Sequence, residues 1–162
     1  MTEMGTLRAD ASRRAVRFER SFAAAPEEVW SALTESDRVE RWLAPAVLEP
    51  RRGGLVEIVF DEEQTVTGVV LTWEPPRLLE YEWRFPGEPE SIVRFALSPQ
   101  VGGTLLVLDH RLLGSEHATG YAAGWHAHLD RLDDLLSGRP CQSWDERFSA
   151  LLPHYREQVV SL

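Results

Sequence analysis

The residues whose types are best suited to chemistry are histidines in the second half of the chain. His110 shares one face of an expected strand with Leu106 and Leu108, so its neighbours predict burial. A buried neutral imidazole can donate one hydrogen bond and accept another, which would let His110 orient a ligand carbonyl or hydroxyl. The alternative is a structural histidine that only satisfies a backbone group.

His126 and His128 lie on an expected long helix near the C-terminus. They are two residues apart, so at about 100° per residue they do not share a helix face. His128 lies at the edge of the apolar stripe of this helix, about 60° from Trp125. Asp130 lies off that stripe, and His126 lies on its opposite flank. Since HExxH and other ligand spacings are absent, the sequence predicts no metal site.

The sequence carries no other catalytic signature. It has no nucleophile elbow, no phosphate loop and no paired cysteine and histidine. Cys141 is the only cysteine, which excludes an internal disulfide and a CxxC pair. We therefore expect no cofactor and assign no catalytic residue. An enzyme would use His110 or His128 as its acid–base group, and Tyr81 or Tyr121 would then donate a hydrogen bond.

Large apolar side chains supply a second kind of candidate site. Apolar pockets with few polar groups are the usual form of a small-molecule site. We expect the ligand-binding residues to be Tyr81, Trp83, Phe95, Leu106, Leu108, His110, Tyr121, Trp125 and His128. The alternative for each apolar member of this set is a place in the ordinary core, because large apolar side chains mostly pack.

The elements that position these residues follow from the hydrophobic pattern. Alternating residues between Gly and Pro clusters predict strands over 16–22, 53–60, 65–73, 79–85, 93–97 and 104–112. Two short helices, beginning near Pro26 and Thr34, follow the first strand. A long helix over 118–136 has apolar residues at intervals of three and four. The order predicts an α+β fold, with a curved antiparallel sheet of about six strands wrapped around the long C-terminal helix.

The two ends of the chain differ from its middle. Residues 1–14 lack periodicity and are expected to be a flexible N-terminus. Residues 15–138 hold the sheet and the long helix. Residues 139–162 are expected to be a C-terminal helical extension, with helical spacing from Trp144 to Val160, which packs on the domain or forms a dimer contact.

Length and charge limit the class of protein. The 162 residues, 43% of them hydrophobic, suit one domain with one core. The net charge is −9, and all 17 basic residues are arginines without a basic stripe, which argues against nucleic acid or an anionic membrane as a partner. The sequence shows no signal peptide and no run of eighteen apolar residues, so we expect a cytoplasmic protein.

Six short segments carry a resemblance to a known family. They are PEEVWSALT at 26–34, RWL at 41–43, GG at 53–54, PPRLL at 75–79, GGT at 102–104, and Gly124-Trp125 with Leu129 and Leu132. In this order they resemble the START/SRPBCC superfamily, and more closely its branch named after the activator of the heat-shock-protein ATPase. The resemblance covers about residues 15–138.

The resemblance implies a helix-grip fold, in which the sheet and the long helix enclose a cavity. Members of the superfamily bind lipids, sterols, polyketides or other apolar small molecules, some catalyse cyclisation or hydrolysis, and a few serve chaperones. Our leading hypothesis is a domain that binds an apolar or lipid-like molecule. The alternatives are a cyclase- or hydrolase-type enzyme that uses a cavity histidine, and a chaperone-associated stress adaptor. The resemblance also suggests a homodimer, through the sheet edge or the C-terminal segment.

Overall fold

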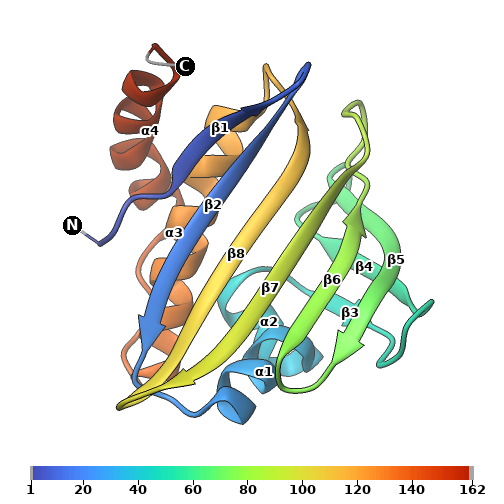
Figure 1. Ribbon diagram of the computed structural model, residues 1–162, viewed down its shortest axis with the longest axis vertical. Coiled ribbons are helices and arrows are strands. Elements are labelled where there is room, and N and C mark those ends of the chain that lie inside the picture. Colours follow the sequence, from blue (N-terminus) through green and yellow to red (C-terminus); the bar gives the residue numbers. More distant parts are fainter. Residues whose placement is uncertain (1, 161–162) are drawn as a thin grey trace.

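One antiparallel sheet and four helices make up the protein, as a computed structural model describes it over residues 2–160. The strands lie in the order β1-β2-β8-β7-β6-β5-β4-β3. Figure 1 shows them in one twisted layer, with α3 crossing behind the sheet and α4 beside α3. The elements are β1 (Thr6–Asp10), β2 (Arg13–Phe22), α1 (Pro26–Thr34), α2 (Ser36–Trp42), β3 (Ala46–Leu48), β4 (Leu55–Val59), β5 (Thr65–Glu74), β6 (Leu78–Trp83), β7 (Ser91–Gln100), β8 (Gly103–Gly114), α3 (Ala118–Leu136) and α4 (Trp144–Val160).

The expected α+β fold, with a sheet around a long C-terminal helix and two short helices after an early strand, is confirmed. The sheet has eight strands rather than about six. Residues 1–14 are expected to be a flexible N-terminus because they lack periodicity, but β1 lies in this segment, pairs with β2 and places Leu7 in the core. That the segment is flexible stays a prediction. The other strand that the sequence did not predict, β3, has only three residues, too few for an alternating pattern.

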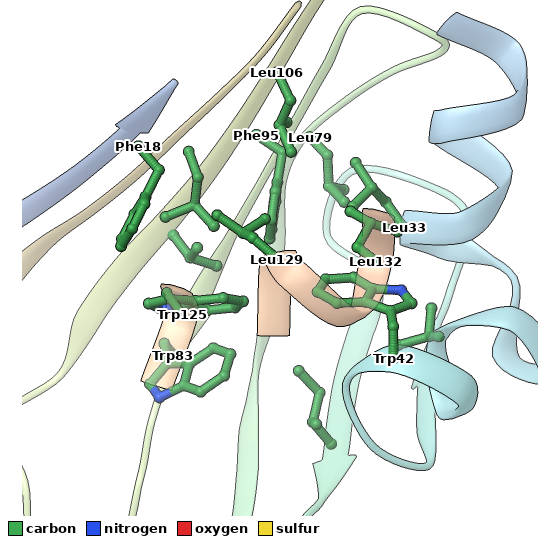
Figure 2. Packing of buried hydrophobic residues seen from close by; sticks show 14 of the residues in the cluster. Phe18, Leu33, Trp42, Leu79, Trp83, Phe95, Leu106, Trp125, Leu129 and Leu132 are labelled. Atoms are coloured by element: carbon green, nitrogen blue, oxygen red, sulfur yellow. The ribbon is translucent and has the colours of Figure 1, made fainter. Parts of the chain in front are cut away.

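The core forms where α3 packs against the concave face of the sheet. Trp125, Leu129 and Leu132 are at most 2% exposed, and Figure 2 shows them among side chains of the strands. Phe18 of β2 and Phe95 of β7 contribute from the sheet. This packing gives the curved sheet the helix that it needs to bury its inner face.

A buried ion pair joins three parts of the chain at the side of α3 that faces away from the sheet's centre. The Asp130 carboxylate accepts hydrogen bonds from Arg20 Nη1 of β2 at 3.0 Å and from Arg147 Nη2 of α4 at 2.8 Å. Burial alone would raise the pKa of Asp130, but hydrogen bonds from Thr2 and Arg147 and the charge of Arg20 hold it below its ordinary value. Asp130 therefore fastens α4 to the domain.

A chain of neutral hydrogen bonds continues from this ion pair. Thr2 Oγ1 donates its one proton to Asp130 at 2.6 Å, so it accepts the N–H of His126 Nε2 at 2.7 Å. His126 Nδ1 is then the unprotonated nitrogen and accepts the Tyr155 O–H at 2.7 Å, while Tyr155 Oη accepts the backbone N–H of Gly5 at 2.7 Å. Each of these groups has a hydrogen-bond partner, whereas the neighbouring Arg20 Nε is buried without one among residues 2–160.

Replacing Asp130 by alanine tests this arrangement. Arg20, whose side chain is 8% exposed, would keep a buried charge without its carboxylate. We expect the free energy of unfolding to fall by about 3 kcal/mol or more, measured by urea denaturation. The control is Glu19→Ala, which removes an exposed pair with Arg17 and should change stability by less than about 0.5 kcal/mol. Equal losses in the two variants would contradict the assignment.

Candidate functional site

A cavity of about 790 Å³ runs along one face of α3. The helix supplies the floor through Gly120, Tyr121, Gly124, Trp125, His128 and Arg131. Arg131 follows Gly120 by eleven positions, and at a rise of 1.5 Å per residue the floor is about 16 Å long. Aromatic side chains from three other regions form most of the walls: Phe60 after β4, Trp83 and Phe85 at the end of β6, and Trp144 and Phe148 on the first turns of α4.

The two glycines of α3 that line the cavity have different surroundings. A Cβ atom built on Gly120 would meet no other atom of residues 2–160 within 4 Å, so the helix backbone is open to the cavity there. A Cβ atom on Gly124 would meet Trp144 Cζ2 at 3.6 Å, and Trp144 Nε1 donates to the Gly124 carbonyl oxygen at 3.2 Å. Gly124 therefore lets the Trp144 ring pack closely on α3, whereas Gly120 leaves space in the cavity.

The end of the cavity near the start of α3 is polar. Trp83 Nε1 donates to Tyr121 Oη at 2.9 Å, and Tyr121 donates to Glu88 Oε1 at 2.5 Å. His117 Nδ1 lies 3.6 Å from the other Glu88 oxygen. Burial and the neighbouring Glu88 raise the pKa of Tyr121, so its hydroxyl stays protonated and polarised toward the carboxylate.

His110 lies behind the cavity wall and has both ring nitrogens occupied. An indole N–H can only donate, so His110 Nδ1 accepts from Trp125 Nε1 at 2.9 Å. The proton is then on Nε2, which donates to Ser91 Oγ at 2.8 Å. Burial lowers the pKa of His110 to about 3, and the ring is neutral. His110 therefore fixes the orientation of Trp125, which does line the cavity.

His128 contributes directly to the cavity wall. Its Nδ1 lies 3.2 Å from the carbonyl oxygen of Trp42, which can only accept, so Nδ1 carries the proton. Burial lowers the pKa of His128 to about 4 and keeps the ring neutral. Nε2 makes no hydrogen bond to the side chains and backbone over residues 2–160. His128 therefore offers a ligand one lone pair as an acceptor.

The structure divides the nine expected ligand-binding residues into three groups. Trp83, Tyr121, Trp125 and His128 line the cavity. His110 supports the wall from behind. The remaining four pack in the core between the sheet and α3, each at most 2% exposed and none of them lining the cavity: Tyr81, Phe95, Leu106 and Leu108. That these residues bind a ligand stays a prediction.

Several residues that shape the cavity were not among the expected set. Glu88 lies in the turn after β6, and Trp144 and Phe148 lie on α4, with their rings stacked 4.8 Å apart. Two signals in the sequence point toward such a surface. One is the pair of glycines four residues apart in the first half of the long helix, and the other is the pair of aromatic residues at helical spacing on the final segment.

Two kinds of feature are absent from residues 2–160. No group of three or more His, Cys, Asp and Glu side chains there is arranged to hold a metal ion. No helix in the same range is long and apolar enough to cross a membrane.

The sheet, the long helix and the cavity between α3 and the surrounding loops define a helix-grip domain. Residues 23–137, well over half of the chain, match the family of Activator of Hsp90 ATPase homolog 1-like proteins. The chain belongs to this family, which confirms the branch of the superfamily that the sequence resembles. No curated protein matches the chain.

Solved structures share the fold over most of the chain. The crystal structure of CalU16 from Micromonospora echinospora is 26% identical, with a TM-score of 0.79 and 96% of each chain covered. DynU16, a protein in the dynemicin biosynthetic locus, is 28% identical with a TM-score of 0.71, over 80% of this chain and 49% of its own. EF2215 from Enterococcus faecalis, at 22% identity and a TM-score of 0.80 over 98% of this chain and 91% of its own, shows the fold alone.

Three buried neutral histidines make the protein sensitive to mild acid. The folded-state pKa is about 3 for His110 and about 4 for His126 and His128, lowered in each case chiefly by burial. In an unfolded chain it is about 6.5, so the unfolded state binds up to about three more protons between about pH 4 and 6.5. We expect the free energy of unfolding to fall through this window as pH drops, by up to about 4 kcal/mol per pH unit.

Urea denaturation at several pH values between 7.5 and 4.5 measures this slope. His128→Gln can still donate to the Trp42 carbonyl but cannot take up a proton. The slope of the unfolding free energy against pH should therefore fall by the contribution of one proton, about 1.4 kcal/mol per pH unit. Stability that stays constant from pH 6.5 to 4.5 in the native protein would contradict the neutral, buried state of these rings.

Proposed function

We propose that this domain binds one elongated, largely apolar small molecule in the cavity along α3. The observation that carries the proposal is the open space over α3 at Gly120, enclosed by aromatic walls. Gly120 leaves space that no side chain of residues 2–160 fills, while five aromatic residues from three separate segments converge around it. A volume of about 790 Å³ falls in the range of ligand pockets.

The side chains of the walls indicate which contacts such a ligand can make. The ring faces of Trp83, Trp125 and Trp144 offer apolar contact. The Nε2 lone pair of His128 and the Tyr121–Glu88 pair offer a few fixed polar contacts, which is the usual way in which an apolar pocket orients its ligand. The likeness to DynU16, from a biosynthetic locus, supports a small organic molecule as the ligand.

An acid–base enzyme is the second candidate, favoured by the cluster of Tyr121, Glu88 and His117 inside the cavity. Of the two expected acid–base groups, His128 lines the cavity, whereas both nitrogens of His110 are already bonded. Of the two expected hydrogen-bond donors, Tyr121 lines the cavity and Tyr81 does not. If a ligand displaced the Tyr121 hydroxyl, the Glu88 carboxylate would lie next to an acidic proton of the ligand and could accept it as a general base.

Native mass spectrometry on gently purified protein separates these functions. Binding predicts a stoichiometric apolar molecule that can be released by denaturation and identified. An enzyme predicts that this molecule, returned to the protein, changes mass on incubation. A chaperone adaptor, as the family name suggests, predicts instead a chaperone that co-purifies and is lost when surface residues, not cavity residues, are changed.

Gly120→Phe is the variant that tests the cavity itself. Its benzyl group would enter the open space above Gly120, and phenylalanine is no worse than glycine inside a helix. We expect at least about a tenfold loss of bound molecule, measured by native mass spectrometry, with a melting temperature that does not fall. Gly120→Ala adds only a methyl group and should keep most of the binding. Unchanged occupancy in Gly120→Phe would contradict the proposed site.

A further inference from the structure

One half-buried carboxylate in this protein lacks an arginine. Among residues 2–160, the other buried or half-buried aspartates and glutamates each have an arginine nitrogen within 4 Å: Glu49, Glu80, Glu82, Asp109, Asp130, Asp133 and Asp134. Glu88, whose side chain is 17% exposed, has only His117 Nδ1, at 3.6 Å. A carboxylate removed from water favours a cationic partner, and the protein supplies no arginine to Glu88.

The surroundings of Glu88 are suited to a cation that comes from outside. The charged groups around the cavity are three carboxylates, Glu88, Glu116 and Asp145, against one arginine, Arg131. Arg131 donates to the backbone carbonyls of Arg41, Trp42 and Gln142, so its donors hold the protein together. The potential in the cavity is therefore negative, and Glu88 is the least exposed of its carboxylates.

Aromatic faces next to Glu88 add to this preference. Trp83 and Tyr121 have ring centroids 6.2 Å apart, and Tyr121 donates to the carboxylate itself. A ligand ammonium that reaches Glu88 would lie beside these rings, where cation–π attraction adds to a charge-assisted hydrogen bond. Farther along the cavity, Trp125 and the stacked pair of Trp144 and Phe148 line the space next to Gly120, and their ring faces suit an aromatic ring system.

We propose that the ligand of this cavity is a flat aromatic molecule that carries a protonated amine, and that the ammonium binds Glu88. This rests on the proposed small-molecule binding. The amine would donate to the Glu88 oxygen that faces His117, or replace the Tyr121 hydroxyl at the other oxygen. The aromatic part would then lie against Gly120 and the neighbouring tryptophan rings.

Three fluorescent probes with one ring skeleton test the charge requirement. They are 9-(aminomethyl)anthracene, a cation at neutral pH, 9-anthracenemethanol, which is neutral, and 9-anthracenecarboxylate, an anion. Titration of the native protein, followed by fluorescence anisotropy, gives three dissociation constants. Because hydrogen bonds to charged groups contribute about 1.5–3 kcal/mol, we expect the amine to bind about tenfold or more tighter than the alcohol, and the acid to bind most weakly.

Two variants that each remove one negative charge test whether Glu88 causes the preference for the amine. Glu88→Gln keeps a side-chain oxygen that can accept the Tyr121 O–H, so the fold should persist, and the amine should lose its advantage over the alcohol. Glu62→Gln removes an exposed carboxylate that does not line the cavity and should leave all three constants unchanged. This control excludes a general attraction of cations by a protein of net charge −9.

Each outcome bears on one of the two proposals. Equal binding of amine and alcohol, or equal loss in both variants, overturns the role of Glu88. If the alcohol still binds and Gly120→Phe abolishes its binding, the small-molecule site stands without that role. The native protein is first freed of any bound molecule. If none of the three probes then binds, the proposal of an aromatic ligand is overturned. A different molecule found by native mass spectrometry would then still support the site.

Discussion

The buried carboxylate of Asp130 is the interaction on which the rest of the structure depends. It holds Arg20 of β2 on one oxygen and Arg147 of α4 on the other, across 127 positions of chain, from 20 to 147. Such a pair is costly to bury, and breaking it by losing one partner is more costly still. By helping to fix α4, this pair also holds one wall of the cavity in place, since Trp144 and Phe148 lie on the same helix as Arg147.

Three faces of helix α3 have different surroundings: the sheet, α4 with the N-terminal segment, and the cavity. One face packs Trp125, Leu129 and Leu132 against the sheet, and another places His126 and Asp130 against α4 and the N-terminal segment. The remaining face is the glycine floor of the cavity. A helix that is covered on so many sides cannot show a simple polar face, which explains why His126 and Asp130 are buried although neither belongs to the apolar stripe.

The sequence predicted the fold better than the site, for a physical reason. Alternation and helical spacing report which side of an element is buried, so the six long strands and α3 could be recognised. Strand β1, with Leu7 as its single buried residue, and the three-residue β3 carry almost no such signal. The pattern also could not separate core from cavity, because Phe95 and Trp83 alternate in the same way on neighbouring strands. Which of them meets empty space depends on the glycines of α3 and on α4, which are distant in sequence.

The hydrogen bonds of the tryptophans determine what a ligand can find in the cavity. Trp83 donates to Tyr121, Trp125 to His110 and Trp144 to the carbonyl of Gly124, so all three indole N–H groups are used by the protein. Their ring faces remain, and these are apolar and electron-rich. The arrangement holds each ring in one orientation and leaves polar contact to the His128 lone pair and the Tyr121–Glu88 end. Because His128 follows Tyr121 by seven residues, about 10 Å along the helix axis, a ligand that satisfies both must extend along α3 rather than fill one end.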